Sequence, residues 1–175
     1  TYGYYVEKVV SVTLPGKDGV VKMKEIMKNL RENPPKALAG KNIDYAMLST
    51  LMHTRTEVLN RVPDQVRFLA ELPEYDIAIY THKKMKTDPE ISLKALQMAR
   101  PALAAIDDFI EENVKAALMA LAQENEMKTG QIMWPVRIAI SGLASTPGGA
   151  TEIAYLIGKE ETLRRIDLGI EKLKG

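Results

Sequence analysis

From Asp44 to the last residue, apolar side chains recur three and four positions apart, and this spacing constrains the fold more than any other feature. Asp44 is suited to cap a helix over residues 45–61, and Pro63 to begin a shorter helix through residue 72. Further helices are predicted from Pro89 onward, over 110–127 with Gly130 closing it, over 151–158 and over 159–175. Because only short loops separate these segments, the pattern predicts a mainly α domain.

The first 43 residues follow a different pattern. Residues 6–14, VEKVVSVTL, alternate and are rich in β-branched side chains, which favours a strand. Pro15-Gly16 then supplies a turn, and residues 20–33 return to helical spacing. This segment is predicted to be a short strand-turn-helix unit, separate from the helices that follow.

Composition excludes several classes of protein. The 175 residues contain no cysteine and two histidines, which rules out disulfides, cysteine-ligated zinc and thiol nucleophiles. The chain has no long apolar run and no signal-peptide pattern at its start, so we expect a cytoplasmic protein with no membrane partner. The net charge of +1 divides into +4 for residues 1–43 (eight basic, four acidic) and −3 for 44–175 (sixteen basic, nineteen acidic). Nucleic-acid binding by the larger part would therefore need a local basic patch.

No sequence motif for catalysis or metal binding is present. The phosphate-binding loops, the HExxH zinc motif and the GxSxG nucleophile motif are all absent, so no catalytic or metal-binding residue is predicted. The carboxylates of residues 107, 108, 111 and 112 are typical of a solvated helix start. A site formed by His53 and His82 is the remaining alternative for a metal.

Residues 130–149, GQIMWPVRIAISGLASTPGG, are the most unusual stretch of the chain. They contain the single tryptophan and, in an apolar run, Arg137. Arg137, like Arg55 in HTRTEVLNR, either pairs with a carboxylate or helix end, or presents its planar fork to a phosphate or base. The Thr-Pro-Gly-Gly turn is either plain turn chemistry or a place where a partner approaches the backbone.

The block from residue 130 onward resembles the C-terminal part of bacterial glutamyl-tRNA synthetases. The shared features are Gly-Gln, Pro-x-Arg-x-Ala-x-x-Gly, Thr-Pro-Gly, Ile-Gly-Lys-Glu and Leu-Arg-Arg, in that order. LMHTRTEVLNRVPDQVRFL resembles the segment that enters the anticodon-binding region of that family. The resemblance covers about residues 44–175 and implies an α-helical module with two lobes, 44–128 and 129–175, that binds the anticodon stem-loop of tRNA-Glu.

The resemblance also implies which residues contact the anticodon. Arg55 corresponds to an arginine placed against the first anticodon base in members that discriminate tRNA-Glu from tRNA-Gln, and Arg137 to a second anticodon-contacting arginine. Thr146, Pro147, Gly148 and Gly149 correspond to a turn that packs against the remaining bases. Gly149 departs from the larger apolar residue found in some members. Unstacked bases recognised by arginine planes and exposed backbone are typical of single-stranded RNA, and no DNA partner is expected.

The motifs of the synthetase catalytic domain, of the HIGH and KMSKS types, are absent. The chain is therefore expected to be a fragment that binds tRNA without charging it and holds no cofactor, because ATP and Mg²⁺ belong to the missing domain. Two alternatives stay open. Residues 1–43 resemble a segment of the α-D-phosphohexomutases, which would make the chain a mutase fragment, although the phosphoserine, metal and phosphate loops of that family are missing. The acidic balance of residues 44–175 would also suit an interaction scaffold that kept the fold but lost tRNA binding.

Overall fold

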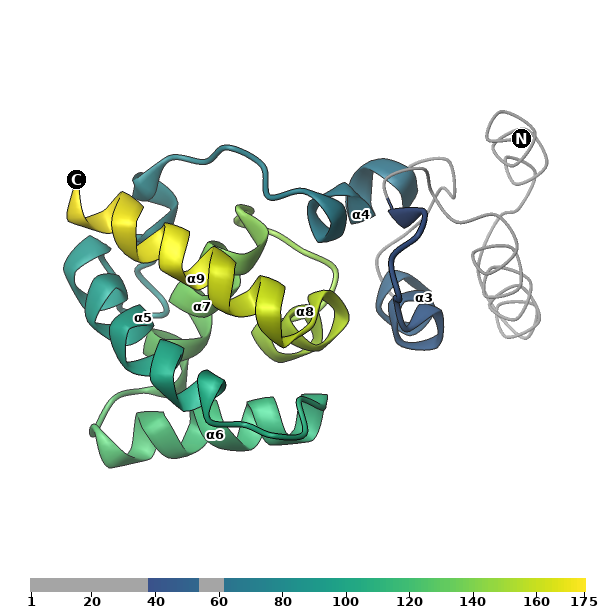
Figure 1. The fold of residues 1–175 in the computed structure, drawn as a ribbon. Helices are drawn as coiled ribbons and strands as arrows, with labels where there is room; N and C mark the ends of the chain where they lie inside the picture. Colours follow the sequence, from purple (N-terminus) through teal and green to yellow (C-terminus); the bar gives the residue numbers. More distant parts are fainter. Residues whose placement is uncertain (1–37, 54–61) are drawn as a thin grey trace. The chain divides into compact units, whose positions relative to one another are not determined.

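The computed structural model describes residues 38–53 and 62–175, and the chain divides into two compact units, Thr1–Glu71 and Leu72–Gly175 (Figure 1). The strand and helix predicted within residues 1–37 lie outside the described residues. Regular structure in the described part is helical, with one isolated bridge between His82 and Thr87. The prediction of a mainly α fold is confirmed.

The first unit contains helices α3 (Tyr45–His53) and α4 (Val62–Ala70). Asp44 caps α3 as predicted, because its Oδ1 accepts hydrogen bonds from the N–H groups of residues 46 and 47, both at 3.0 Å. Pro63 lies in the first turn of α4, where its missing N–H costs no hydrogen bond. At the other end of α4, the Lys41 ammonium donates to the carbonyl of Ala70 at 2.9 Å, which satisfies one of the last carbonyls of the helix.

The second unit begins with a 3₁₀ turn, η3 (Ile77–Tyr80). Five helices follow: α5 (Pro89–Ala104), α6 (Glu111–Glu124), α7 (Thr129–Ser141), α8 (Ala150–Ile157) and α9 (Lys159–Lys174). Helix α5 begins as predicted, since the Asp88 side chain accepts from Ile91 N–H at 2.8 Å and Pro89 occupies the first turn. In this part of the chain no helix is long and apolar enough to cross a membrane.

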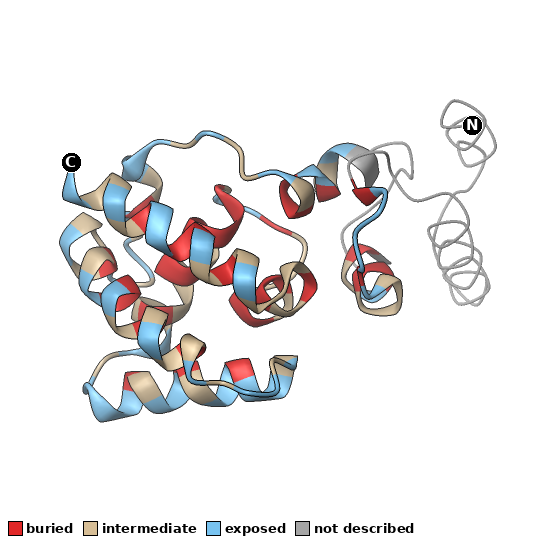
Figure 2. Ribbon diagram, in the orientation of Figure 1, coloured by how far each residue is buried: buried red, intermediate tan, exposed pale blue. Residues whose placement is uncertain are grey.

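The core of the second unit lies where α5 and α7 meet their neighbours. Helix α5 packs against α6, α7 and α9, and α7 also packs against α6, α8 and α9. The inward faces of these helices are buried and their outer faces exposed (Figure 2). Fully buried apolar side chains come from every one of the five helices: Leu96, Leu103, Leu118, Ile132, Ile138, Ile140, Ile153 and Ile166. The amphipathic spacing that predicted the helices therefore also identified the core face.

The predicted end of α6 was wrong. Gly130 is the second residue of α7, and α6 ends at Glu124. The chain leaves α6 through Glu126, which adopts a left-handed backbone with φ of 54°. The Met127 and Glu126 N–H groups donate back to Ala122 O (2.9 Å) and Gln123 O (3.2 Å), the Schellman pattern that glycine usually completes. Because a glutamate occupies the position that glycine usually takes, the sequence pattern did not predict this helix end.

The division into compact units differs from the lobes predicted at 44–128 and 129–175, and the lobe boundary stays a prediction. Helices α5 and α6, on one side of that boundary, share a core with α7, α8 and α9 on the other. The division lies instead between Glu71 and Leu72, before the extended segment that leads into η3. Through α7, residues 129–175 share the core of the second unit with α5 and α6.

Candidate functional site

The unusual stretch of residues 130–149 forms α7, a tight turn and the start of α8. Gln131 stabilises the first turn of α7, because its side-chain oxygen accepts from the Lys128 N–H at 2.9 Å. Pro135 lies inside the helix and is buried. Trp134 is only partly buried, and its indole N–H donates to the Ile79 carbonyl of η3 at 3.1 Å. The tryptophan thus fixes η3 against α7 while part of its ring stays accessible.

Arg137 lies one turn after Trp134 on α7. Its guanidinium carbon lies 4.5 Å from the centre of the Trp134 ring, and its Nη2 donates to the Ala144 carbonyl at 2.7 Å. The side chain is partly exposed. The bond to a carbonyl just beyond the helix end agrees with the structural interpretation of this arginine. The partly exposed guanidinium over the indole also leaves the base-binding interpretation open, since guanidinium planes stack on unpaired bases.

Helix α7 ends at a left-handed glycine, and a turn begins there. Gly142 has φ of 67°, and its N–H donates to Ile138 O at 2.8 Å. In the turn, the Thr146 hydroxyl donates to the Gly148 carbonyl at 2.9 Å, and the residue is 2% exposed. Thr146 therefore shapes the turn from inside. Pro147, Gly148 and Gly149 are half-buried, and the most exposed positions of the turn are Ala144 and Ser145.

The backbone at the start of α8 is already hydrogen-bonded. The Gly149 N–H donates to Glu152 Oε2 at 3.0 Å. The Thr151 hydroxyl, in turn, donates to Glu111 Oε1 of α6 at 2.6 Å. Glu111 thus has a packing role, whereas the neighbouring carboxylates of residues 107, 108 and 112 are exposed, as predicted for a solvated helix start. A partner at this turn would meet carbonyl groups and the Pro147 ring more readily than the Gly149 amide.

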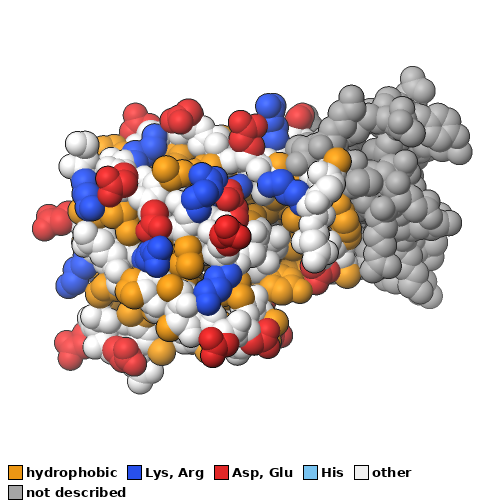
Figure 3. Space-filling view, in the orientation of Figure 1, with side chains coloured by type: hydrophobic (Ala, Val, Ile, Leu, Met, Phe, Trp, Pro, Cys, Tyr) orange, Lys and Arg blue, Asp and Glu red, His pale blue; other side chains and the backbone are white. Residues whose placement is uncertain are grey.

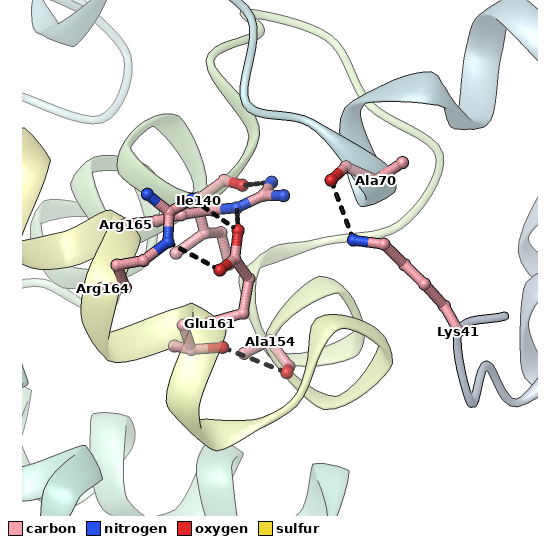
Figure 4. Close-up of polar contacts among 8 residues, drawn as sticks. Lys41, Ala70, Ile140, Ala154, Glu161, Arg164 and Arg165 are labelled. Carbon is pink, nitrogen blue, oxygen red and sulfur yellow. Dashed lines mark hydrogen bonds and ion pairs between the residues drawn. The ribbon is translucent and has the colours of Figure 1, made fainter. Parts of the chain in front are cut away.

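A buried arginine of α9 binds the last turn of α7 (Figure 4). Arg165 of α9 is 0% exposed; its Nη1 donates to Ile140 O at 2.7 Å and its Nε to Glu161 Oε1 at 2.7 Å. Arg164 donates two hydrogen bonds of 2.7 Å to the same carboxylate. These contacts, those from Arg164 first, lower the pKa of Glu161 to about 2, while burial lowers the pKa of Arg165. The Leu-Arg-Arg sequence therefore supports the helix end that carries the turn.

The structure brings together some predicted site residues and adds others. Arg137 and the turn of residues 146–149 lie at the same end of α7, whereas Arg55 lies outside the described residues. Sequence analysis considered His82 only as half of a possible metal site with His53; in the structure its ring centre lies 4.1 Å from that of Trp134. His82 Nδ1 accepts from the Met85 N–H at 3.2 Å, so it has a structural role. The remaining histidine, His53, ends α3 in the other unit, and no metal-binding group of three ligands occurs in the described residues.

A family profile described as an anticodon binding domain matches residues 23–170. The chain belongs to this anticodon-binding domain family. The match includes residues 23–43, which sequence analysis had grouped with the segment resembling a phosphohexomutase. The family assignment therefore extends further toward the N-terminus than the motifs at residues 44–175 indicated.

Relatives of this anticodon-binding chain are named glutamate–tRNA ligases. The protein from Clostridium tetani (strain Massachusetts / E88) is 50% identical over 139 residues, which are 79% of this chain and 28% of the relative. The protein from Clostridium novyi (strain NT) is 52% identical over 127 residues, which are 73% of this chain and 26% of the relative. The chain thus spans little more than a quarter of the length of these relatives.

Solved structures share the fold. A glutamate tRNA ligase from Elizabethkingia meningosepticum CCUG26117, in complex with its amino acid, matches 98% of this chain and 32% of its own, with a TM-score of 0.67 and 23% identity. A glutamate-tRNA synthetase from Elizabethkingia anophelis matches 97% of this chain with a TM-score of 0.63 and 21% identity. At this identity the likeness supports the helical fold of the family.

Proposed function

We propose that this chain is the anticodon-recognising part of a glutamate–tRNA ligase and that it binds the anticodon stem-loop of tRNA-Glu. One observation carries the proposal: the Arg137 guanidinium lies over the Trp134 ring, 4.5 Å from its centre, and donates a hydrogen bond to the Ala144 carbonyl of the turn, in a member of the anticodon-binding family. A guanidinium held in this way loses little conformational entropy on binding. It offers a plane and donor groups to an unstacked base.

The residues divide into contacting and supporting groups under this proposal. Arg137 and the Pro147-Gly148 backbone contact bases, and Arg55 contacts the first anticodon base. Thr146 and the Glu161–Arg165 pair support the turn, because their polar groups are bonded within the protein. Neighbouring charges on the molecular surface are mixed, with basic and acidic side chains interspersed on the face in Figure 3. Such a surface favours a local contact over a broad electrostatic one.

The test is a titration of the chain with tRNA-Glu and with the same tRNA carrying a changed anticodon, at low and moderate salt. We expect salt-sensitive binding that weakens when the anticodon changes. Arg137→Ala should weaken binding of the cognate tRNA by about 1–3 kcal/mol, the cost of one good base contact. Arg137→Lys keeps the charge but loses the plane, so it should lose anticodon discrimination while keeping the salt dependence.

Equal binding of both tRNAs by the parent chain would contradict anticodon recognition. Parent-like affinity and discrimination in both Arg137 variants would remove this residue from the site. No detectable binding of any tRNA would favour the scaffold alternative.

We infer that the chain supplies recognition and no aminoacylation chemistry, with ATP and Mg²⁺ handled by a separate catalytic domain of the ligase. Since its relatives are named as tRNA ligases, we place it in the cytoplasm with the translation machinery. The mutase alternative is not favoured, because the family match takes in half of the segment that suggested it. Absence of phosphoglucomutase turnover by the purified chain would agree with this view.

A further inference from the structure

A compact loop at residues 82–87, here called the lysine loop, presents basic side chains beside α7. His82 and Thr87 pair across its base, with backbone N–H to O distances of 3.0 Å and 3.3 Å. Lys83, Lys84 and Lys86 lie between them and are all exposed. Lys86 has a left-handed backbone with φ of 56°, which turns the chain back toward Thr87.

The lysine loop is fixed to the body of the second unit at several points. The Gln131 amide of α7 donates to Lys86 O at 3.1 Å, and the Thr87 hydroxyl donates to Tyr80 O at 2.8 Å. The His82 ring contacts Trp134, with 4.1 Å between ring centres. The backbone is therefore held in one position while the lysine side chains extend into solvent. A fixed loop loses less entropy when it binds a ligand than a flexible one would.

The charge of the lysine loop is not balanced within the described part of the chain. None of its three ammonium groups forms an ion pair there, and the carboxylate of Asp88, next in sequence, accepts the capping hydrogen bond from Ile91. Other basic residues of the unit do form ion pairs with carboxylates: Arg100 with Asp167, Arg164 and Arg165 with Glu161, Lys172 with Glu74, and Lys174 with Glu171. The loop is thus a local basic patch on a mixed surface.

The lysine loop is connected to Arg137 through a row of contacting side chains. His82 contacts Trp134, and the next contact along the row is the Arg137 guanidinium over the same indole. Gln131, Trp134 and Arg137 are three residues apart, so they follow one side of α7. A ligand contacting Arg137 would therefore meet the loop further along the same side of the helix.

We propose that the lysine loop binds backbone phosphates of the RNA whose anticodon bases contact Arg137 and the 146–149 turn; this inference rests on the proposed function. Lysine ammonium groups bind phosphate as point charges and read no sequence. The loop contributes affinity and salt dependence, and the end of α7 contributes discrimination.

The test uses the full chain and an anticodon stem-loop RNA of tRNA-Glu, titrated across a range of salt concentrations. The test variant carries Lys83→Ala and Lys84→Ala, and leaves Lys86 in place because of its left-handed backbone. The control variant carries Lys94→Ala and Lys115→Ala, two exposed lysines on α5 and α6, and so removes the same charge. Circular dichroism checks that both variants keep the helical fold.

The slope of log K against log salt is negative, and each lost phosphate contact makes it shallower by roughly 0.7–0.9. Two lost contacts therefore reduce its magnitude by roughly 1.4–1.8. We expect this change in the test variant, with the ratio of affinities for cognate and altered anticodons unchanged and the control variant close to the parent. A parent-like slope in the test variant would overturn the lysine loop proposal and leave the proposed function standing. An equal loss in both variants, or a changed anticodon ratio in the test variant, would also overturn it. Failure of the parent chain to bind the RNA would overturn the proposed function and this inference with it.

Discussion

Glu161 is the residue through which pH is expected to act on the second unit. Hydrogen bonds from Arg164 and Arg165 hold its pKa at about 2, below its ordinary value of 4.5. A carboxyl whose pKa is lower in the folded state stabilises the protein above its unfolded pKa, and this contribution disappears as pH falls through the folded value. The stabilisation from Glu161 is therefore complete above about pH 4.5 and lost toward pH 2.

Replacing Glu161 by glutamine should remove this contribution. The stability of Glu161→Gln relative to the parent should be lowest at neutral pH, with the difference narrowing as the pH falls below 4.5. Urea unfolding of both proteins at pH 7 and near pH 3 measures the difference. A stability difference that is the same at both pH values would show that the Glu161 charge is not what stabilises the contacts with Arg164 and Arg165.

At Gly169, α9 packs closely against η3, α7 and α5. A Cβ atom there would lie 2.8 Å from the Tyr80 hydroxyl, 3.0 Å from Ala139 Cβ and 3.2 Å from a Leu96 methyl group. All of these groups are buried, and Tyr80 is fixed by a 3.0 Å hydrogen bond to Tyr75. Gly169→Ala should therefore destabilise the protein by about 1–3 kcal/mol, as overpacking generally does.

Gly130 supplies the matched control for this prediction. Its added Cβ would meet mainly the Met85 sulfur, at 2.8 Å, which lies at the end of a flexible side chain and can move. Gly130→Ala should be neutral or stabilising by up to about 1 kcal/mol, since alanine favours the helix. Thermal unfolding of both variants distinguishes the two cases. Similar melting temperatures for them would contradict the close approach at Gly169.

At the scale of helices, Arg165 joins α9 to the end of α7. The guanidinium is fully buried between Glu161 and the Ile140 carbonyl, and removing it leaves that carbonyl without this donor. Arg165→Met should cost about 3 kcal/mol, as breaking a buried pair typically does. Arg164→Met is the control, because Arg164 binds the same carboxylate from a side chain that is 55% exposed.

The control variant should lose less than about 1 kcal/mol, the usual value for an exposed ion pair. Guanidinium denaturation midpoints of the two variants measure the difference. If Arg164→Met were as destabilising as Arg165→Met, burial would not be what distinguishes the two arginines.

A destabilised Arg165 variant that still folds at low temperature should also bind tRNA more weakly, because the turn begins two residues after Ile140.

Local chemistry explains which helices were predictable. Helices start at Asp44 and at Asp88, whose side chains accept hydrogen bonds from residues two or three positions away. The adjacent sequence is therefore enough to predict these helix starts. The end of α6 was missed because Glu126 takes a conformation that the sequence pattern assigns to glycine. The contact of His82 with Trp134, and that of Arg165 with Ile140, join segments distant in sequence, and no spacing rule predicts them. The candidate site was therefore located by its motif, while its supporting residues needed the fold.

At the scale of the whole molecule, the second unit has the features of an independently folding domain. Its helices α5 to α9 pack on one another around buried side chains from each, and its first segment is held by Lys172, which donates to Tyr75 O at 2.9 Å. We expect a fragment of residues 72–175 to unfold cooperatively on heating. Near-ultraviolet circular dichroism of Trp134 reports whether its packing is native. A fragment with helical content but no Trp134 signal would contradict the prediction.

The same fragment separates the contributions of the two units to RNA binding. It retains Arg137, the 146–149 turn and the lysine loop, but it lacks Arg55, which we place against the first anticodon base. The fragment should therefore keep most of the salt dependence of the whole chain, because phosphate contacts set that slope. It should lose discrimination at the first anticodon position while keeping it at the others, since each base is read by its own contacts. Titration with stem-loops altered at one anticodon base at a time measures this directly. If the fragment discriminated at the first position as well as the whole chain does, recognition of that base would have to come from the second unit, and the role proposed for Arg55 would fail.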